Sequence, residues 1–333
     1  MRSFAAGVCV AVFWVGFSGS AGAGDRGLSQ ADVDAGVRRG LDFLVKDAKA
    51  WREEHNCVSC HHAALVVWSM READRRGIEV DRPALDGLTA WLAESGDGRT
   101  GAPRPKGVPK ALNTKAVYFA LGLGADPDPS PAVKAGLGRL LKTVEEDQTE
   151  DGSWAAWPET RPPMFGPSDE SMTALAALAL SPAAEAGDPA ARAVLDKAVR
   201  RLDATKTDGD PQSLALRLVL WRRLKRPNAE WFPLVDRIEA RQNADGGWSQ
   251  AEGMPSDAWA TGQALYALAW AGVPPVEPPV ARAQSFLLKT QRPDGSWPMT
   301  SRPIKPGGPG AKNLVPITGA AAAWAVMGLA RSR

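Results

Sequence analysis

Apolar residues recur at helical spacing along most of this chain, in paired segments that Gly and Pro residues separate. Each pair combines an amphipathic segment, expected as an outer helix, with a segment rich in small residues, expected as an inner helix. We expect outer helices at 31–47, 82–94, 131–147, 188–203, 229–242 and 277–291, and inner helices at 60–76, 112–123, 169–180, 211–225, 257–271 and 314–330. The repeating unit is therefore one helical hairpin.

The phrase Gln-x-x-Asp-Gly-x-Trp occurs three times, at residues 148–154, 242–248 and 291–297. Asp-Gly is a strong turn signal because Gly adopts positive φ without steric cost, so each copy is expected to end an outer helix and reverse the chain. The Gln and Trp then lie close across the turn, where the amide bonds backbone groups or the indole face and the ring packs between neighbouring helices. The phrase predicts where the hairpins turn and stack.

The third copy extends into a longer motif, Arg282-Ala283-x-x-Phe286-Leu287-x-x-x-Gln291-x-x-x-Gly295-x-Trp297. This motif resembles the QW motif of the squalene-hopene cyclase and oxidosqualene cyclase family, whose relatives include the protein prenyltransferases. The other two copies keep the Gln, Gly and Trp, and a degenerate fourth copy begins at Arg39, with Ala48 at the position of the Gln. The resemblance covers most of residues 30–330 and implies a terpenoid cyclase-like fold.

Six hairpins are enough to close a ring, so the sequence predicts an all-α protein with an α/α toroid of concentric inner and outer helices. Ala-rich inner segments, such as 173–179 and 319–324, let helix backbones approach closely in a crowded inner layer. The competing architecture is an open solenoid of the HEAT or tetratricopeptide type. Its 34-residue signature is absent and the Asp-Gly-x-Trp turns are foreign to it, so the closed toroid is favoured.

The first residues are expected to be a signal peptide. Arg2 precedes an apolar run over residues 4–17, and Ala21-Gly22-Ala23 offers a small-residue cleavage site. The run is shorter than the roughly 20 residues that a membrane-spanning helix needs. The sequence therefore predicts a signal peptide at 1–23, a single toroid domain at 24–333 and export to the periplasm or the extracellular space. No other stretch is apolar enough to span a bilayer.

The charge balance argues against one class of partner. The chain carries 40 Lys and Arg against 38 Asp and Glu, and loss of the signal peptide removes Arg2 alone, which leaves a net charge near +1. Such a balance predicts neither nucleic acid nor an anionic surface as partner. The mature chain of about 310 residues exceeds the usual size of one core, which suits a ring whose hairpins contact mainly their neighbours.

The family resemblance also implies a place for a catalytic acid. Cyclases of this family protonate an alkene with the central Asp of an Asp-x-Asp-Asp-Thr-Ala motif, and the matching frame here is Asp-Glu-Ser-Met-Thr-Ala at 169–174. Ser171 stands at the position of the proton donor. The step demands a carboxylic acid held neutral and unusually acidic, which a serine hydroxyl cannot replace. Family triterpene cyclases also resemble two joined barrels, whereas this chain supplies about one, so standard class II cyclase activity is not expected.

Asp169 and Asp257 are the candidate catalytic residues. Each follows a Ser and precedes a Thr by four residues. One interpretation places them as carboxylates at the mouth of the cavity, and the other makes them helix N-caps, whose side chains accept a backbone N–H. A zinc site of the prenyltransferase kind is not indicated, because the three histidines, His55, His61 and His62, all lie near the N-terminus.

The sharpest local motif is Cys-Val-Ser-Cys-His at residues 57–61. It resembles the attachment site of c-type cytochromes, where two thioethers hold the haem and the histidine ligates its iron. The resemblance implies Cys57 and Cys60 as covalent haem attachment points and His61 as the iron ligand, in an exported protein. The sixth ligand stays open among the methionines at positions 70, 164, 254 and 299. Two alternatives remain, a disulfide or thiol pair, and a metal site that also uses His62.

Three functional hypotheses follow from these features. An aromatic-lined cavity, with Trp259, Trp270 and Trp324 on inner helices, would bind an apolar, isoprenoid-class small molecule, although such residues are more often core. The second hypothesis is a haem c redox or sensor protein on a toroid scaffold. The third is an interaction scaffold whose Pro-rich loops, at 155–167 and 298–316, bind a protein or a polysaccharide.

Overall fold

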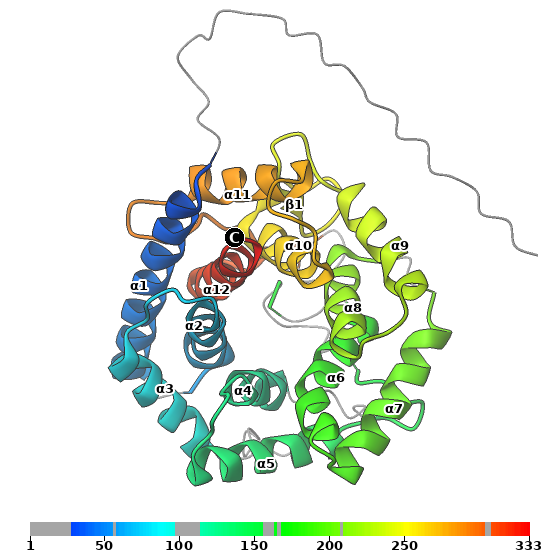
Figure 1. Ribbon diagram of the computed structural model, residues 1–333. Helices are drawn as coiled ribbons and strands as arrows, with labels where there is room; N and C mark the ends of the chain where they lie inside the picture. The colour runs from blue at the N-terminus through cyan, green and yellow to red at the C-terminus, as the bar shows by residue number, and fades with distance from the viewer. Residues whose placement is uncertain are drawn as a thin grey trace, which may run out of the picture.

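The computed structural model describes residues 28–55, 58–96, 114–155, 163–164, 168–206, 209–303 and 308–333. Its helices form two concentric rings (Figure 1). The outer ring consists of α1 (Gln30–His55), α3 (Arg82–Glu94), α5 (Pro131–Glu146), α7 (Pro189–Ala204), α9 (Asn228–Glu239) and α11 (Pro278–Thr290). The inner ring consists of α2 (Leu65–Arg75), α4 (Thr114–Gly124), α6 (Asp169–Glu185), α8 (Pro211–Arg223), α10 (Ala258–Ala271) and α12 (Val315–Ser332).

The inner ring is closed. Each inner helix contacts the inner helix before and after it, and α12 returns to contact α2. Outside it, α1 packs against both α12 and α11, so the first and last hairpins meet (Figure 1). The predicted α/α toroid is confirmed, and the open solenoid is not what the chain forms.

Small residues allow the inner helices to pack this closely. At the contact of α10 with α12, a Cβ on Gly262 would lie 2.5 Å from the backbone carbon of Trp324, and one on Gly328 would lie 2.7 Å from the Gly262 oxygen. Contacts of that length between a Cβ and a backbone atom do not occur. Glycine is therefore required on both sides of this contact, as the small-residue pattern predicted.

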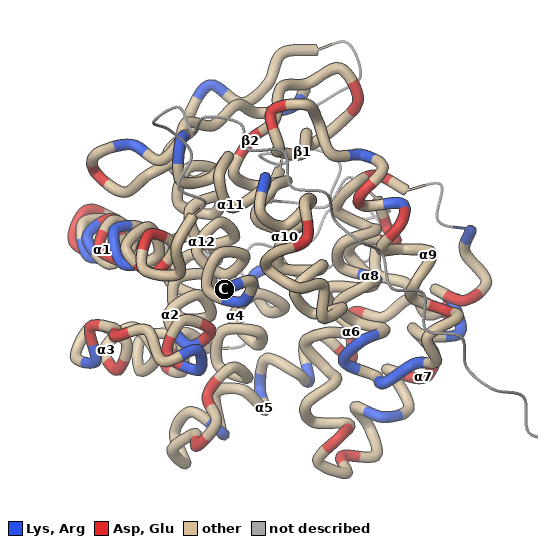
Figure 2. Tube along the Cα trace, turned by 45° about the horizontal axis from the view of Figure 1, so that its top comes forward, with Lys and Arg blue, Asp and Glu red and all other residues tan. Residues whose placement is uncertain are grey.

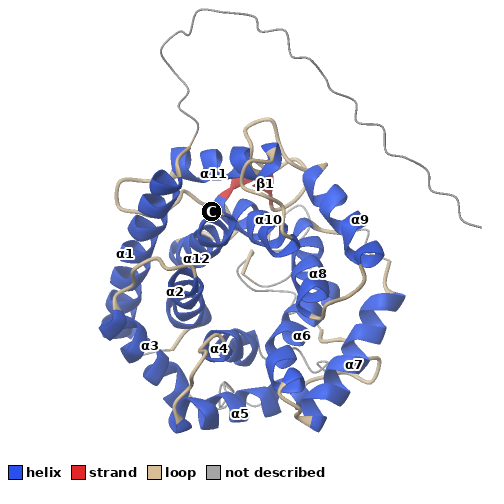
Figure 3. Cartoon of the chain, viewed as in Figure 1, coloured by secondary structure: helices blue, strands red, loops and turns tan. Residues whose placement is uncertain are grey.

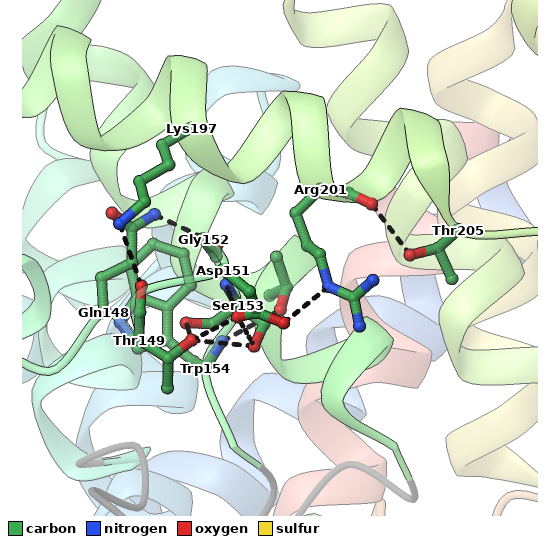
Figure 4. Close-up of polar contacts among 10 residues, drawn as sticks. Gln148, Thr149, Asp151, Gly152, Ser153, Trp154, Lys197, Arg201 and Thr205 are labelled. Atoms are coloured by element: carbon green, nitrogen blue, oxygen red, sulfur yellow. Dashed lines mark hydrogen bonds and ion pairs between the residues drawn. The ribbon is translucent and has the colours of Figure 1, made fainter.

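Each repeated phrase forms a turn that ties two hairpins together, and Figure 4 shows the first. Gln148 Nε2 donates to the Val194 oxygen of the next outer helix at 2.9 Å. Trp154 Nε1 donates to the Val144 oxygen of its own outer helix at 2.8 Å, and Trp154 N donates to Thr173 Oγ1 on the following inner helix. The Gln thus reaches forward to the next repeat, while the Trp anchors the turn to its own hairpin.

The Gly of the phrase meets two requirements at once. All three copies have positive φ, between 86° and 91°, where a side chain is strained. Each also lies against the backbone of the next outer helix. An added Cβ on Gly152, Gly246 or Gly295 would be 2.6, 2.7 or 2.0 Å from the backbone oxygen of Lys197, Arg282 or Arg39 respectively.

The third turn closes the outer ring. Gln291 Nε2 donates to the Gly36 oxygen on α1 at 3.0 Å, and Arg39 Nη2 donates to Gln291 Oε1 at 2.7 Å. Arg282 makes the equivalent bond to Gln242 one repeat earlier. The degenerate fourth motif on α1 is therefore the partner of the last turn rather than a turn of its own.

The predicted helices agree with the structure except around the first hairpin and at the end of α6, which was expected near residue 180 but continues through Pro182 to Glu185. The first outer helix was expected to end near residue 47, but α1 continues to His55, because Ala48 and the residues after it contain no Asp-Gly turn. A one-turn π-helix, η1 (Cys60–Ala64), precedes α2. Two short strands, β1 (Trp248–Ser249) and β2 (Ser256–Asp257), pair antiparallel before α10 (Figure 3).

Charged residues gather on the outer helices and at the ends of the inner ones, and α10 carries none (Figure 2). Within the described residues, every helix is too short or too polar to cross a membrane. The predicted signal peptide at 1–23 lies outside the described residues.

Candidate functional site

Polar side chains cap the amino ends of three successive inner helices. Ser168, Asp210 and Asp257 are the N-caps of α6, α8 and α10, and each accepts a hydrogen bond from a backbone N–H in the first turn. Ser168 Oγ also donates to Asp210 Oδ2 at 3.1 Å and lies 3.1 Å from Ser213 Oγ. This chain of caps forms one rim of the toroid, which we call the amino rim.

Asp257 is the buried carboxyl of the amino rim, with 5% of its surface exposed. Its Oδ1 accepts from Ala260 N at 2.9 Å, and its Oδ2 accepts from Gln250 Nε2 at 2.6 Å. Burial raises the pKa of Asp257 to about 6, against these hydrogen bonds and the nearby Arg302 charge, which lower it. The carboxyl is thus poised to exchange a proton near neutral pH, although both oxygens have partners.

Asp169 is placed differently, because it follows the cap instead of being the cap. It is the first residue of α6 and is exposed, whereas Ser168 before it accepts the cap bond from Ser171 N at 3.3 Å. The N-cap interpretation is therefore confirmed for Asp257 and wrong for Asp169. Ser171 is fully buried, and its Oγ donates to the Ser168 oxygen at 2.8 Å.

A polar groove of about 770 Å³ lies beside Asp257. Gln250, Asp210 and Arg302 line it. Gln250 donates through Nε2 to Asp257 and to the Thr300 oxygen, and its Oε1 is buried without a hydrogen-bond partner. The sequence did not indicate Gln250 or Arg302, because their positions depend on loops that the turn motif does not specify.

A second site lies at the centre of the ring. It is a cavity of about 90 Å³ whose wall comes from five inner helices, α2, α4, α6, α8 and α10. Most of the residues that line it are apolar or aromatic, among them Trp68, Ala120, Leu121, Leu178, Ala179, Val219 and Tyr266. We call this cavity the central pocket.

Aromatic rings form one wall of the central pocket and continue behind it. The Trp68 and Tyr266 ring centroids are 6.2 Å apart, and both pack edge-on against Trp324, at 5.3 and 5.8 Å. Trp259 extends the cluster beyond Trp324 at 6.1 Å. Of the three tryptophans predicted to line a cavity, Trp270 lines the pocket directly, while Trp324 and Trp259 support the rings that do.

The histidines of the Cys-x-x-Cys-His segment lie in η1 and are buried. His62 Nε2 lies 3.1 Å from Asp47 Oδ2, and its Nδ1 lies 3.3 Å from Ser59 Oγ. The ring of His61 packs edge-on against Trp51 and His62, with centroids 5.4 and 4.3 Å apart. Trp51 also stacks face to face on His62 at 4.2 Å.

The cysteines themselves are not placed. Cys57 lies outside the described residues, and for Cys60 the structure gives the backbone alone. Among the described residues, no group of three or more His, Cys, Asp or Glu side chains converges on a point that would hold a metal ion. Haem attachment, a disulfide and a metal site therefore all stay predictions.

Sequence comparison shows which family part of this chain is similar to. Residues 214–292 match the family model of the squalene-hopene cyclase N-terminal domain. The chain is thus squalene-hopene cyclase-like in both repeat motif and fold. A curated relative, drimenyl diphosphate synthase of Streptomyces showdoensis, is 36% identical over 160 residues. That match covers 42% of this chain and 28% of the relative, so the chain spans less than a third of the relative's length.

Solved structures share the fold. The type II terpene cyclase MstE from Scytonema superposes with a TM-score of 0.55 at 15% identity, over 90% of this chain and 98% of MstE. A polysaccharide lyase superposes with a TM-score of 0.57 at 12% identity, over 89% of this chain and 96% of its own. At such identities the likeness is one of architecture, and this architecture serves more than one chemistry.

Proposed function

We propose that this chain is an exported, squalene-cyclase-like protein that binds an apolar, isoprenoid-class ligand in the central pocket, without the alkene protonation of the standard cyclases. The observation that carries the proposal is the lining of the central pocket, which is apolar or aromatic apart from Arg75, Arg223 and Gly124. Two relatives support the ligand class. One is named for a terpenoid product, and MstE has been solved with geranylgeranyl dihydroxybenzoate as its substrate.

The size of the pocket limits how the ligand binds. Its volume of about 90 Å³ is smaller than an engineered cavity of about 150 Å³ that holds benzene. The pocket therefore accepts a short branched end of an isoprenoid, and the remainder of the ligand extends through the opening. Aromatic rings at 5–7 Å spacing suit such a group, since they bury large apolar area with little loss of side-chain freedom.

Ser171 supports the absence of alkene protonation. Its hydroxyl is buried and donates to the Ser168 oxygen, and no carboxyl stands in its place. Asp257 is the nearest analogue of a buried acid on the amino rim, yet Ala260 N and Gln250 Nε2 occupy its two oxygens. An unpaired carboxylic acid aimed at an alkene is what the protonation step requires.

Titration of the full chain with farnesol tests ligand binding. Tryptophan fluorescence should show saturable binding, because Trp68 and Trp270 line the pocket. Ala179→Leu fills the pocket and should abolish binding, whereas Ala186→Leu, at the exposed carboxyl end of the same helix, should not. Binding that survives Ala179→Leu in a protein with unchanged melting temperature would place the ligand elsewhere.

Incubation with squalene, followed by mass spectrometry, tests the absence of cyclisation. We expect unchanged squalene. A cyclised product that disappears in Asp169→Asn or Asp257→Asn would contradict the proposal and assign the acid. Export is tested by expression with the natural N-terminus, for which we expect a secreted chain that begins at Gly24.

A second candidate function is a haem c protein, favoured by the setting of His61. His61 is the histidine of the Cys-x-x-Cys-His motif, and its buried ring packs edge-on against Trp51 and His62. An aromatic and apolar surround suits the face of a porphyrin. Cys57 and Cys60 would hold the haem through thioethers. A bound haem supplies electron-transfer or ligand-sensing chemistry.

Co-expression with a haem-attachment system tests this candidate. A covalent species with a Soret band, lost in Cys57→Ser with Cys60→Ser, would support it. A purified, exported chain without covalent haem would exclude it, and a thiol count of the same sample would then separate the disulfide from the reduced pair.

A further inference from the structure

The central pocket has two layers of different chemistry. At the carboxyl ends of the inner helices it is lined by Arg75 on α2, Arg223 on α8 and Trp270 on α10, together with Gly124, Ala125 and Pro182. Arg75 follows Trp68 by seven residues, and Arg223 and Trp270 follow Val219 and Tyr266 by four, which are the spacings of one helix face. The layer of Trp68, Val219 and Tyr266 is therefore apolar or aromatic, and the layer nearer the carboxyl ends of the helices carries two guanidinium groups.

These positive charges lack matching negative charges in the pocket wall. Of the residues that line the central pocket, two are Arg and none is Asp or Glu. Arg223 Nε donates to the neutral Ser181 Oγ at 2.7 Å, and its carboxylate neighbour, Glu185, is 3.8 Å away and largely exposed. Arg75 donates to the backbone oxygen of Ala125. The wall thus presents two guanidinium groups, of which Arg75 bonds a backbone oxygen and Arg223 bonds Ser181 and pairs with Glu185 outside the pocket wall.

A third guanidinium strengthens the local positive field. Arg331 lies over the Trp270 ring, 3.6 Å from its centroid, and pairs with the buried Glu72 at 2.7 Å. Glu72 also lies 3.3 Å from Arg76, so its charge is shared between two arginines. Burial lowers the pKa of Arg223, and the charges of Arg75 and Arg331 add to this, against Glu185. A bound anion would relieve that repulsion.

We infer that the central pocket takes an anionic amphiphile, with its apolar end among Trp68, Leu178 and Tyr266 and its phosphate or carboxylate head between Arg75 and Arg223. The inference rests on the proposed function for the apolar end, and it adds the chemistry of the head. Guanidinium groups suit such a head, because their planar N–H groups pair with phosphate and carboxylate oxygens.

Calorimetric titration of the full chain with matched twelve-carbon probes tests the head and the tail separately. Dodecyl phosphate and dodecanoate carry the anion, dodecanol carries the tail alone, and inorganic phosphate carries the head alone. We expect both anionic probes to bind roughly 10-fold or more tightly than dodecanol, the size of one charge-assisted hydrogen bond. Dodecanol should still bind.

Arg75→Gln and Arg223→Gln should each bring the affinity for dodecyl phosphate down towards that for dodecanol, while leaving dodecanol binding unchanged. Arg38→Gln, on the exposed side of α1, removes one positive charge away from the pocket and should leave the preference intact. Arg75 is more exposed than Arg223. The Arg75→Gln variant therefore keeps the test decisive if Arg223→Gln fails to fold.

The outcomes separate the inference from the function on which it rests. Equal affinities for dodecanol and dodecyl phosphate would overturn the anionic head while leaving the apolar pocket in place. Binding of inorganic phosphate without dodecanol would support the head and overturn the apolar ligand. Loss of the preference in Arg38→Gln as well would show a general charge effect and overturn the assignment to Arg75 and Arg223.

Discussion

Gly295 illustrates, at the scale of single residues, how strongly the turn motif is constrained. It has a φ of 86°, and a Cβ there would lie 2.0 Å from the Arg39 oxygen. A positive φ and the absence of a Cβ are both required where one hairpin packs against the backbone of the next. A side chain at this position strains the turn and pushes α1 away from the ring.

Gly295→Ala should therefore lower the free energy of unfolding by about 2–4 kcal/mol, from backbone strain and overpacking. Gly87→Ala, inside helix α3 with no atom within 4 Å of its added Cβ, provides the control. It should raise the free energy of unfolding by about 0.5–1 kcal/mol, because Ala is the better helix former. Urea denaturation of both variants measures the contrast, and equal effects would refute the close contact.

Asp257 makes a prediction about pH. Burial raises its pKa to about 6 in the folded chain, above the unfolded value of about 3.9. The folded state thus favours the protonated carboxyl, so this contribution to stability is full below pH 4 and is lost as pH rises through 6. The two-unit shift corresponds to at most about 3 kcal/mol.

Asp257→Asn keeps a capping oxygen but does not titrate. The variant should therefore gain stability relative to the parent protein as pH rises from 4 to 7, which urea unfolding at several pH values measures. Ser130→Ala, which removes the cap of α5 and breaks no hydrogen bond to a titrating group of the described residues, should cost about 1 kcal/mol at every pH. A constant difference between Asp257→Asn and the parent protein would show that Asp257 does not titrate in this range.

At the scale of elements, the third turn joins the last outer helix to the first. The other two turns join outer helices that follow one another in the sequence. Gln291 bonds the Gly36 oxygen and Arg39, across more than 250 residues of sequence. Gln242 makes the same bonds to the Pro279 oxygen and Arg282, between neighbours in sequence. The two glutamines form a matched pair for testing ring closure.

Gln291→Ala should speed amide hydrogen exchange in the first half of α1, because it releases the seam between α1 and α11. Gln242→Ala should instead speed exchange in α11 and leave α1 protected. Each variant should cost about 1–2 kcal/mol, the net contribution of the partly exposed hydrogen bonds that are lost. Uniform faster exchange over the whole ring in both variants would contradict a local seam.

The hairpins were predictable because their signals are local. Pro and Gly mark the helix ends, and the Gln, Gly and Trp of the repeated phrase each have a fixed partner in the turn. The end of α1 was missed for a related reason. The partial motif at Arg39 predicted a turn after residue 47. Ala48 stands where the motif has its Gln, so no turn forms and the helix continues to His55.

The candidate sites were less predictable because they depend on contacts between distant segments. Asp257 was found from its position before Thr261, but its burial comes from Gln250 and from the loop that holds Arg302. Arg75 and Arg223 lie about 150 residues apart, and only the closed ring brings them to one opening. No spacing of residues in the sequence predicts such a pair.

At the scale of the whole molecule, closure of the inner ring creates a pocket that no single hairpin contains. Five helices contribute to its wall, with small residues on α4 and α6 and aromatic rings on α2 and α10. Its volume is small, so one added side chain changes it greatly. We propose that an isoprenoid-class ligand binds in this pocket without being cyclised.

The most direct test is a farnesol titration of the full chain beside Ala179→Leu and Ala186→Leu, with recovery of the ligand for mass spectrometry. We expect saturable binding of farnesol to the parent protein and to Ala186→Leu, and no binding to Ala179→Leu. The farnesol should be recovered unchanged. Equal binding to all three proteins, or a cyclised product from the parent protein, would contradict the proposal.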